Sequence, residues 1–117
     1  MAVLESRKEA VPTPRVQVPG VVTKGEPFLV RTLISHPMET GLRHDSDGTL
    51  IPRKIINRFT CRYVGKAVFT VDLHEAVAAN PFLEFYVLAQ TSGRLEFIWE
   101  EDGGAVYKLE QQLAVHG

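Results

Sequence analysis

Short segments in which apolar and polar residues alternate make up much of this sequence, and they limit the folds open to the chain. In residues 28–35 every second side chain falls on one face of an extended segment. In residues 94–100, Leu95, Phe97 and Trp99 alternate with mostly charged neighbours. Because successive side chains of a β-strand point to opposite faces, this period of two predicts strands with one buried face.

Turn signals separate these segments along the chain. Pro19-Gly20 and Asp102-Gly103-Gly104 interrupt extended pieces, and Val64-Gly65-Lys66 joins two alternating segments as a hairpin. The segments predicted to be strands are residues 15–18, 21–23, 28–35, 55–63, 67–73, 82–91, 94–100 and 105–115. One helical turn or two is predicted over residues 72–80, where Asp72 caps the first turn, Glu75 is its reciprocal partner and Asn80-Pro81 ends the helix.

About seven short strands with frequent turns and one short helical turn predict an all-β fold. We expect an immunoglobulin-like antiparallel β-sandwich rather than a closed barrel. Residues 1–14 are polar and contain two prolines, so they are expected to form a flexible leader before a single domain over residues 15–117.

The overall composition argues against several classes of function. The formal net charge is −1 and the basic residues are scattered, which disfavours binding to nucleic acid. No apolar run approaches the roughly 18 residues that a membrane span needs. Charges near the N-terminus argue against a signal peptide, so the chain read alone looks cytoplasmic. A single cysteine, Cys61, excludes an internal disulfide.

The segment HPMETGLRHDSDG, residues 36–48, gathers several metal-binding residue types. His36, Met38, His44 and Cys61 together supply the ligand types of a blue-copper site. The order along the chain does not fit, because Cys61 lies within a predicted strand and not in a C-terminal loop beside the other ligands. We therefore expect Cys61 to be a small core residue.

Other catalytic or metal-binding motifs are incomplete. Asp45, Asp47 and Gly48 resemble part of a calcium loop, but its twelfth position falls at Ile56 instead of a glutamate, so a tight turn explains them better. His36 and His44 lie eight residues apart and match no zinc spacing. No serine lies in a GxSxG motif, no glycine-rich loop opens a helix, and the remaining histidines are expected in solvent. We expect no catalytic residues, no metal and no cofactor.

The connection after residue 35 is long and unusually apolar. Met38, Leu42, Leu50, Ile51 and Pro52 lie within a loop of roughly twenty residues, longer than most connections in compact domains. Either the loop folds back over its own end of the sandwich, or it forms a surface for a partner protein.

Four segments of the chain resemble the SoxZ family, the small subunits of the SoxYZ sulfur carrier in bacterial thiosulfate oxidation. They are HPMETGLR, DGTLIPRKIINRFTCRYVGKAVF, AVAANPFLEF and SGRLEFIWEEDGG, and the similarity extends from about Val16 to Val115. The resemblance implies an immunoglobulin-type subunit without catalytic activity that pairs with SoxY. In that family SoxY carries the working cysteine on a glycine-rich C-terminal arm. This chain ends in LEQQLAVHG, and Cys61 does not match the carrier cysteine.

The resemblance also implies the partners and the compartment. SoxY's cysteine is loaded and processed by the enzymes SoxAX, SoxB and SoxCD, and the small subunit stabilises SoxY and helps to present its arm. The pair works in the periplasm, to which the small subunit is exported together with SoxY. Such a heterodimer is expected to bury on the order of 2,000 Å² in total. A strip of exposed Phe, Tyr and Leu on one sheet face would mark the interface.

We expect the long loop to form one exposed end of the molecule that touches partner proteins. The residues assigned to this surface are His36, Met38, Glu39, Arg43, Asp45, Pro52 and Arg53. Two other classes of function remain open at this point. One is a small metal-binding redox domain that uses His36, His44 and Cys61, and the other is a sandwich that binds a carbohydrate or a surface receptor.

Overall fold

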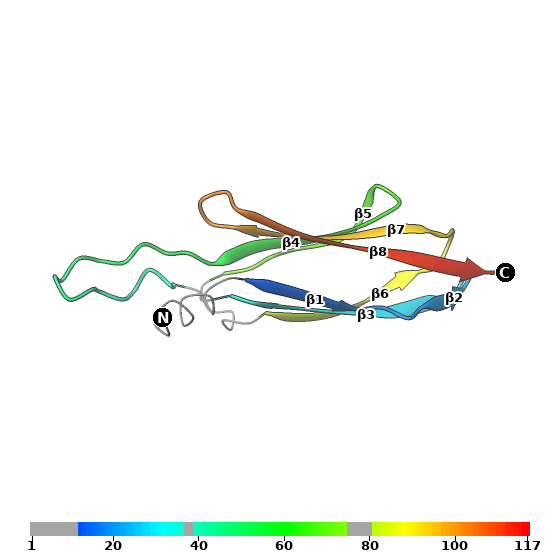
Figure 1. Cartoon of the computed structure of the whole chain (residues 1–117), viewed down its shortest axis with the longest axis horizontal. Coiled ribbons are helices and arrows are strands. Elements are labelled where there is room, and N and C mark those ends of the chain that lie inside the picture. Colours follow the sequence, from blue (N-terminus) through cyan, green and yellow to red (C-terminus); the bar gives the residue numbers. More distant parts are fainter. Residues whose placement is uncertain (1–11, 37–38, 75–80) are drawn as a thin grey trace, which may run out of the picture.

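The computed structural model describes residues 12–36, 39–74 and 81–117. Eight strands form two sheets that pack face to face (Figure 1). Their bounds are β1 Thr13–Gln17, β2 Val21–Thr23, β3 Pro27–Ser35, β4 Ile56–Tyr63, β5 Lys66–Asp72, β6 Phe82–Leu88, β7 Gly93–Glu101 and β8 Val106–His116. The described residues contain no helix, and therefore none that is long and apolar enough to cross a membrane.

The two sheets differ in width. One has the order β1-β3-β6, and the other has the order β2-β8-β7-β4-β5. The chain changes sheets at Pro19-Gly20, so that β1 pairs with β3 while β2 pairs with β8. The predicted immunoglobulin-like sandwich is confirmed. One pair differs from the antiparallel expectation, because β2 runs parallel to β8.

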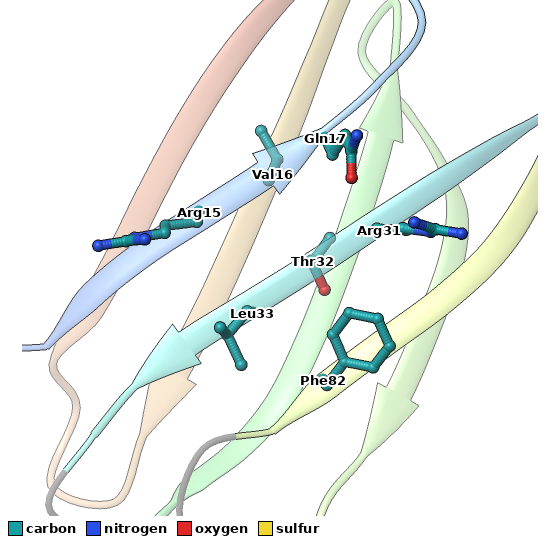
Figure 2. A pocket seen from close by; sticks show the side chains of 7 residues that line it. All are labelled: Arg15, Val16, Gln17, Arg31, Thr32, Leu33 and Phe82. Carbon is teal, nitrogen blue, oxygen red and sulfur yellow. The ribbon is translucent and has the colours of Figure 1, made fainter.

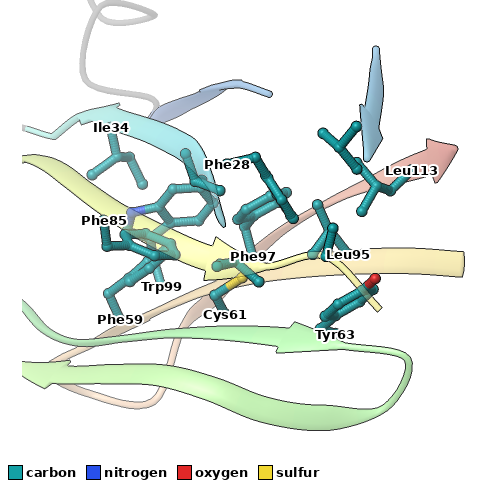
Figure 3. Close-up of a cluster of buried hydrophobic side chains, with 14 of the residues drawn as sticks. Phe28, Ile34, Phe59, Cys61, Tyr63, Phe85, Leu95, Phe97, Trp99 and Leu113 are labelled. Carbon is teal, nitrogen blue, oxygen red and sulfur yellow. The ribbon is translucent and has the colours of Figure 1, made fainter. Parts of the chain in front are cut away.

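Aromatic side chains from both sheets fill the space between them (Figure 3). The ring of Phe59 lies 5.2 Å from that of Trp99 on the neighbouring strand and 5.9 Å from that of Phe85 on the opposite sheet. Cys61 points into the same core and is fully buried, as the alternation in its strand predicted. Burying such large side chains is the main favourable contribution to a core of this kind.

A register shift at the start of β4 places Ile56 and Phe59 in the core together. Between Ile56 and Arg58 the pairing of β4 with β7 gains one residue, Asn57. Such a bulge redirects side chains and increases the local twist. The side-chain amide of Asn57 reaches the turn at the end of β7, where it donates a hydrogen bond to Asp102.

Two predicted boundaries differ from the structure. β1 begins at Thr13, two residues before the expected start of the domain, and residues 1–11 of the expected leader lie outside the described residues. Asp72, predicted to cap a helix, instead ends β5 and accepts a hydrogen bond of 2.8 Å from Arg58 Nε. Most of the rest of the predicted helix, residues 75–80, also lies outside the described part of the chain.

The hairpin between β4 and β5 holds a strained residue. Val64 has φ of 50°, a left-handed conformation that a β-branched side chain rarely adopts, and Gly65 follows with φ of 79°. Both central residues of a type I′ turn have positive φ, and asparagine suits the first of them. Val64→Asn should therefore raise the free energy of unfolding by about 1 kcal/mol, measured by urea titration.

Val106→Asn is the matched control, because Val106 is an exposed valine of β8 that pairs regularly with Glu100 of β7. It should leave stability unchanged or lower it. A Val64→Asn protein no more stable than the wild type would show that the turn is not strained.

Candidate functional site

The connection between β3 and β4 folds into a narrow hairpin, here called the projecting loop (residues 39–54). Figure 1 shows that it extends well beyond the end of the sandwich. Glu39 and Lys54 exchange two backbone hydrogen bonds of 2.9 and 2.7 Å, and Ile51 N donates to Arg43 O at 2.8 Å. These bonds give an otherwise irregular segment a fixed shape.

The tip of the projecting loop is a tight turn stabilised by Asp45. The Asp45 carboxylate accepts from the backbone N–H of Asp47 and of Thr49 at 2.9 and 3.0 Å. Gly48 N donates to Asp45 O, and Gly48 has φ of 83°, which suits glycine. The prediction that a turn explains these acidic residues is confirmed, because the Asp45 carboxylate accepts hydrogen bonds from backbone N–H groups of the turn.

Asp102, in the turn after β7, binds the segment that runs from the projecting loop into β4. Its carboxylate accepts two hydrogen bonds from Arg53, both 2.8 Å, one of 3.1 Å from the backbone N–H of Ile55 and one of 2.9 Å from Asn57 Nδ2. The bonds from Arg53 are the main cause that lowers the pKa of Asp102 to about 2, although partial burial opposes them.

Glu101, the residue before Asp102, holds the end of β3, from which the chain leads to the projecting loop. Its carboxylate contacts His36 Nε2 and accepts a hydrogen bond of 3.3 Å from the Tyr107 hydroxyl. Burial, and then the neighbouring Glu101, raise the pKa of Tyr107. His36 is 4% exposed. The expectation that His36 lies on the exposed loop surface is therefore wrong, because it is buried against Glu101, a residue 65 positions away, and beside the ring of Tyr107.

Glu101 and Asp102 thus form a clamp on the projecting loop. Successive residues at the end of a strand point in opposite directions, so one carboxylate reaches the segment that leaves β3 and the other reaches the segment that enters β4. Neither of these residues, nor Asn57 nor Tyr107, was predicted from the sequence. The available signal was the acidic pair in front of Gly103-Gly104, which was interpreted only as a turn.

The other residues assigned to the loop surface have different environments. Glu39, Arg43, Asp45, Pro52 and Arg53 all lie on the projecting loop, while Met38 lies outside the described residues. Glu39 and Arg43 form an ion pair of 2.6 Å, and that hydrogen bond lowers the pKa of Glu39. Residues 42–50 are exposed throughout, so this segment does not fold back over the sandwich.

The loop also presents apolar side chains to solvent. Leu42 is 80% exposed and Leu50 is 50% exposed. Because the loop is held by the clamp and by its own hydrogen bonds, these leucines are kept in place on a rigid support. Exposed apolar groups on an ordered loop are typical of contact with another molecule.

The candidate metal ligands do not come together. His36 lies against Glu101, His44 is exposed on the projecting loop and Cys61 is in the core. Within residues 12–36, 39–74 and 81–117, no three His, Cys, Asp or Glu side chains are grouped so that they could hold a metal ion. Burial raises the pKa of the Cys61 thiol to about 12, which makes it a poor nucleophile at neutral pH.

The outer surface of the three-stranded sheet carries a second feature, here called the apolar face. Its members come from β3 and β6 and lie in register, with Leu29 beside Tyr86, Leu33 beside Phe82 and Pro27 beside Leu88. Tyr86 is 70% exposed and Phe82 is 56% exposed. A strip of exposed Phe, Tyr and Leu on one sheet face was expected for an interface, and it is present.

Polar residues interrupt and border the apolar face. Arg31 and Glu84 form an ion pair of 2.8 Å across its middle. A hollow of about 330 Å³ lies beside Arg31, lined by residues that include Arg15, Leu33 and Phe82 (Figure 2). The face is therefore uneven, with an apolar strip along β6 and a basic margin along β1.

The outer surface of the five-stranded sheet is different in kind. Charged side chains from neighbouring strands pair across it, with Lys108 Nζ 3.1 Å from Glu96, Arg94 3.5 Å from Glu110 and Arg58 2.8 Å from Asp72. Such a network of exposed ion pairs is suited to solvent. The two faces of the sandwich therefore have opposite chemical character.

These features define an immunoglobulin-like module with a protruding, hydrogen-bonded loop and one apolar face, two features typical of proteins that contact other proteins. The family described as "Sulphur oxidation protein SoxZ" matches residues 16–112 of the chain. The chain therefore belongs to the SoxZ family, as the sequence motifs indicated, and is a subunit of the Sox sulfur-oxidation system. No curated protein sequence matches the chain.

Solved structures support the fold. A single-substitution variant of the superoxide reductase (neelaredoxin) from Ignicoccus hospitalis is similar with a TM-score of 0.69 and 18% identity, covering 95% of this chain and 86% of that one. Another structure of superoxide reductase (neelaredoxin) from the same organism has a TM-score of 0.68 and 17% identity, covering 99% and 88%. At such low identity the likeness concerns the sandwich alone.

The low pKa of Asp102 gives a pH-dependent contribution to stability. Its pKa lies below the usual 3.8, so the clamp stabilises the folded state fully above about pH 4 and loses this contribution as the pH falls through about 2. Asp102→Asn should lower the free energy of unfolding by about 2 kcal/mol at pH 7, and the variant should lack that part of the acid dependence. Urea titrations from pH 2 to 7 measure both effects.

Asp72→Asn is the matched control, because it breaks an ion pair that is exposed on both sides. It should cost less than about 1 kcal/mol at pH 7. If both variants lost the same free energy of unfolding, the stabilising role assigned to Asp102 would be contradicted.

Proposed function

We propose that this protein is the non-catalytic subunit of a SoxYZ-type sulfur carrier and that it pairs with SoxY through the apolar face. Membership of the SoxZ family supports the general role. The observation that carries the proposal is the exposed strip formed by Phe82, Tyr86 and Leu88 along β6. Large apolar side chains gathered on one face of a small protein usually become buried in a stable complex.

The charges of the molecule support the choice of this face. On the opposite face a docking partner would have to remove water from several ion pairs at once, which is costly unless each charge finds a new partner. On the apolar face, Arg31 and Glu84 neutralise each other in an ion pair of 2.8 Å. Docking there removes mainly apolar surface from water.

In this proposal the chain itself supplies no reacting group. Cys61 is fully buried in the core of the sandwich and its thiol has a pKa of about 12, so it cannot carry sulfur between enzymes. The chemistry belongs to a cysteine on SoxY, and this subunit holds SoxY and orients it. The pair works in the periplasm, where the chain arrives together with SoxY.

The projecting loop has a separate role in the proposal. Because Glu101 and Asp102 hold both of its sides, it presents Leu42 and Leu50 at a fixed place beyond the end of the sandwich. We propose that this end touches the enzymes that visit the carrier, SoxAX, SoxB and SoxCD. A preorganised contact loses little conformational freedom on binding, which suits partners that must exchange quickly.

Substitution on the apolar face tests the pairing with SoxY. Phe82→Asp replaces a large apolar side chain of the proposed contact by a charge and should weaken SoxY binding at least tenfold, measured by titration calorimetry. Thr70→Asp is the control, since Thr70 is exposed on the outer face of β5. If the wild-type chain forms no complex with SoxY, or if both variants bind as it does, the proposal fails.

Substitution on the projecting loop tests the second contact. Leu42→Asp should leave SoxY binding within twofold of the wild type, because Leu42 lies away from the apolar face. It should lower thiosulfate turnover of the reconstituted enzymes severalfold. Val21→Asp, at an exposed apolar residue on β2 at the other end of the sandwich, should change neither quantity. Unchanged thiosulfate turnover with Leu42→Asp would contradict the proposed contact between the projecting loop and the visiting enzymes.

A further inference from the structure

Four strands lie at the edges of the two sheets, and three of them carry features that discourage pairing with another chain. β1 contains Pro14 and Arg15, β2 has only three residues and follows Pro19-Gly20, and β5 begins with Lys66 and has a register shift opposite Cys61 and Arg62. Proline, lysine, bulges and short length are the usual means by which a protein protects a sheet edge.

β6 is less protected. Its seven residues, FLEFYVL, contain no proline and no lysine, and their one charged side chain, Glu84, is paired with Arg31 of the neighbouring β3. Its pairing with β3 continues without a register shift from Pro27 opposite Leu88 to Leu33 opposite Phe82. A long, regular and apolar edge strand of this kind is a template for pairing with a further strand.

The register shows which backbone groups of β6 face outwards. Ile34 N donates to Pro81 O at 3.3 Å, and Ala89 N donates to Glu26 O at 3.0 Å, so odd-numbered residues are bonded to β3 and the segments that flank it. In an antiparallel pair the intervening residues direct both N–H and C=O to the other side. These intervening residues are Phe82, Glu84, Tyr86 and Leu88.

The unequal sheets leave a position for an added strand. Phe85 of β6 stacks on Phe69 of β5, with ring centroids 4.2 Å apart, so β6 lies over the outer strands of the wider sheet. Phe69 and Val71 of β5 are only partly buried. None of the eight strands pairs with the free edge of β6. A strand added there would cover the inner side of β5.

The size of the apolar face points the same way. Three strands of about seven residues, at ~3.3 Å per residue and ~4.8 Å between strands, span roughly 300 Å² of sheet plane. A stable complex usually buries roughly 800 Å² on each partner. The edge of β6 is continuous with the most apolar strip of this face, so a contact that uses both the face and the edge buries more surface than the face alone.

We infer that an extended strand of the SoxY subunit pairs with the free edge of β6 and enlarges the three-stranded sheet to four strands. This inference rests on the proposed function and specifies how the two subunits join. Backbone hydrogen bonds to Phe82, Glu84, Tyr86 and Leu88 fix the register. Alternate apolar side chains of the added strand continue the apolar face on one side and cover Phe69 and Val71 on the other.

Hydrogen exchange on the intact heterodimer tests the inference. In the isolated chain the amides of the four outward residues should exchange fast, whereas those of Leu83, Phe85 and Val87 should be protected by β3. In the complex the four outward amides should exchange at least a hundredfold more slowly. If the heterodimer forms and those amides remain fast, the inference is overturned while the proposed function stands.

Two substitutions at Tyr86 distinguish the contribution of backbone pairing at the edge of β6 from that of side chains on the apolar face. Tyr86→Thr removes the aromatic ring and keeps the backbone N–H, while Tyr86→Pro removes both and spares the bonds to β3. Tyr86→Pro should bind SoxY at least tenfold more weakly than Tyr86→Thr. Equal binding would overturn the inference. The inference would also be overturned if the four outward amides exchanged slowly in the isolated chain and that chain had the mass of a dimer. In that case a second copy of this chain would occupy the edge of β6.

Discussion

A sheet of three strands cannot cover a sheet of five, and this inequality determines most of what the molecule offers to a partner. The aromatic side chains of Phe59, Phe85 and Trp99 hold the two sheets together where they overlap. At the margin of this overlap Phe69 of β5 stacks on Phe85 and stays only partly buried. The uneven layers leave an apolar edge open, and this arrangement is consistent with the proposed pairing with another chain.

The clamp of Glu101 and Asp102 solves a separate physical problem. A loop of this length loses much conformational entropy when it is ordered, and its exposed backbone bonds alone offset little of that loss. Two carboxylates at the end of a buried strand hold both sides of the loop with hydrogen bonds to charged and neutral donors. Charge-assisted bonds of this type are among the stronger polar contacts in proteins, so the loop has a fixed direction.

The strands were predictable because burial on one side of a strand is a local pattern. Residues 28–35 and 94–100 show it clearly, and Cys61 was placed in the core for the same reason. The parallel pairing of β2 with β8 was not predictable, since neither strand's composition records its neighbour. His36 was misplaced because its partner lies 65 residues away, and ionisable residues in loops are usually solvated. Asp102 was overlooked because a turn alone explains an Asp-Gly-Gly sequence.

The burial of Cys61 has a consequence for the chemistry of a carrier. A thiolate is the species that attacks a disulfide or a sulfur-loaded cysteine, and such attack would divert cargo onto the wrong chain. With a pKa of about 12 and no exposed surface, the Cys61 side chain stays protonated and out of reach. In the proposed complex the subunit can therefore lie next to activated sulfur without reacting, because its single thiol does not compete for cargo attached to a neighbouring chain.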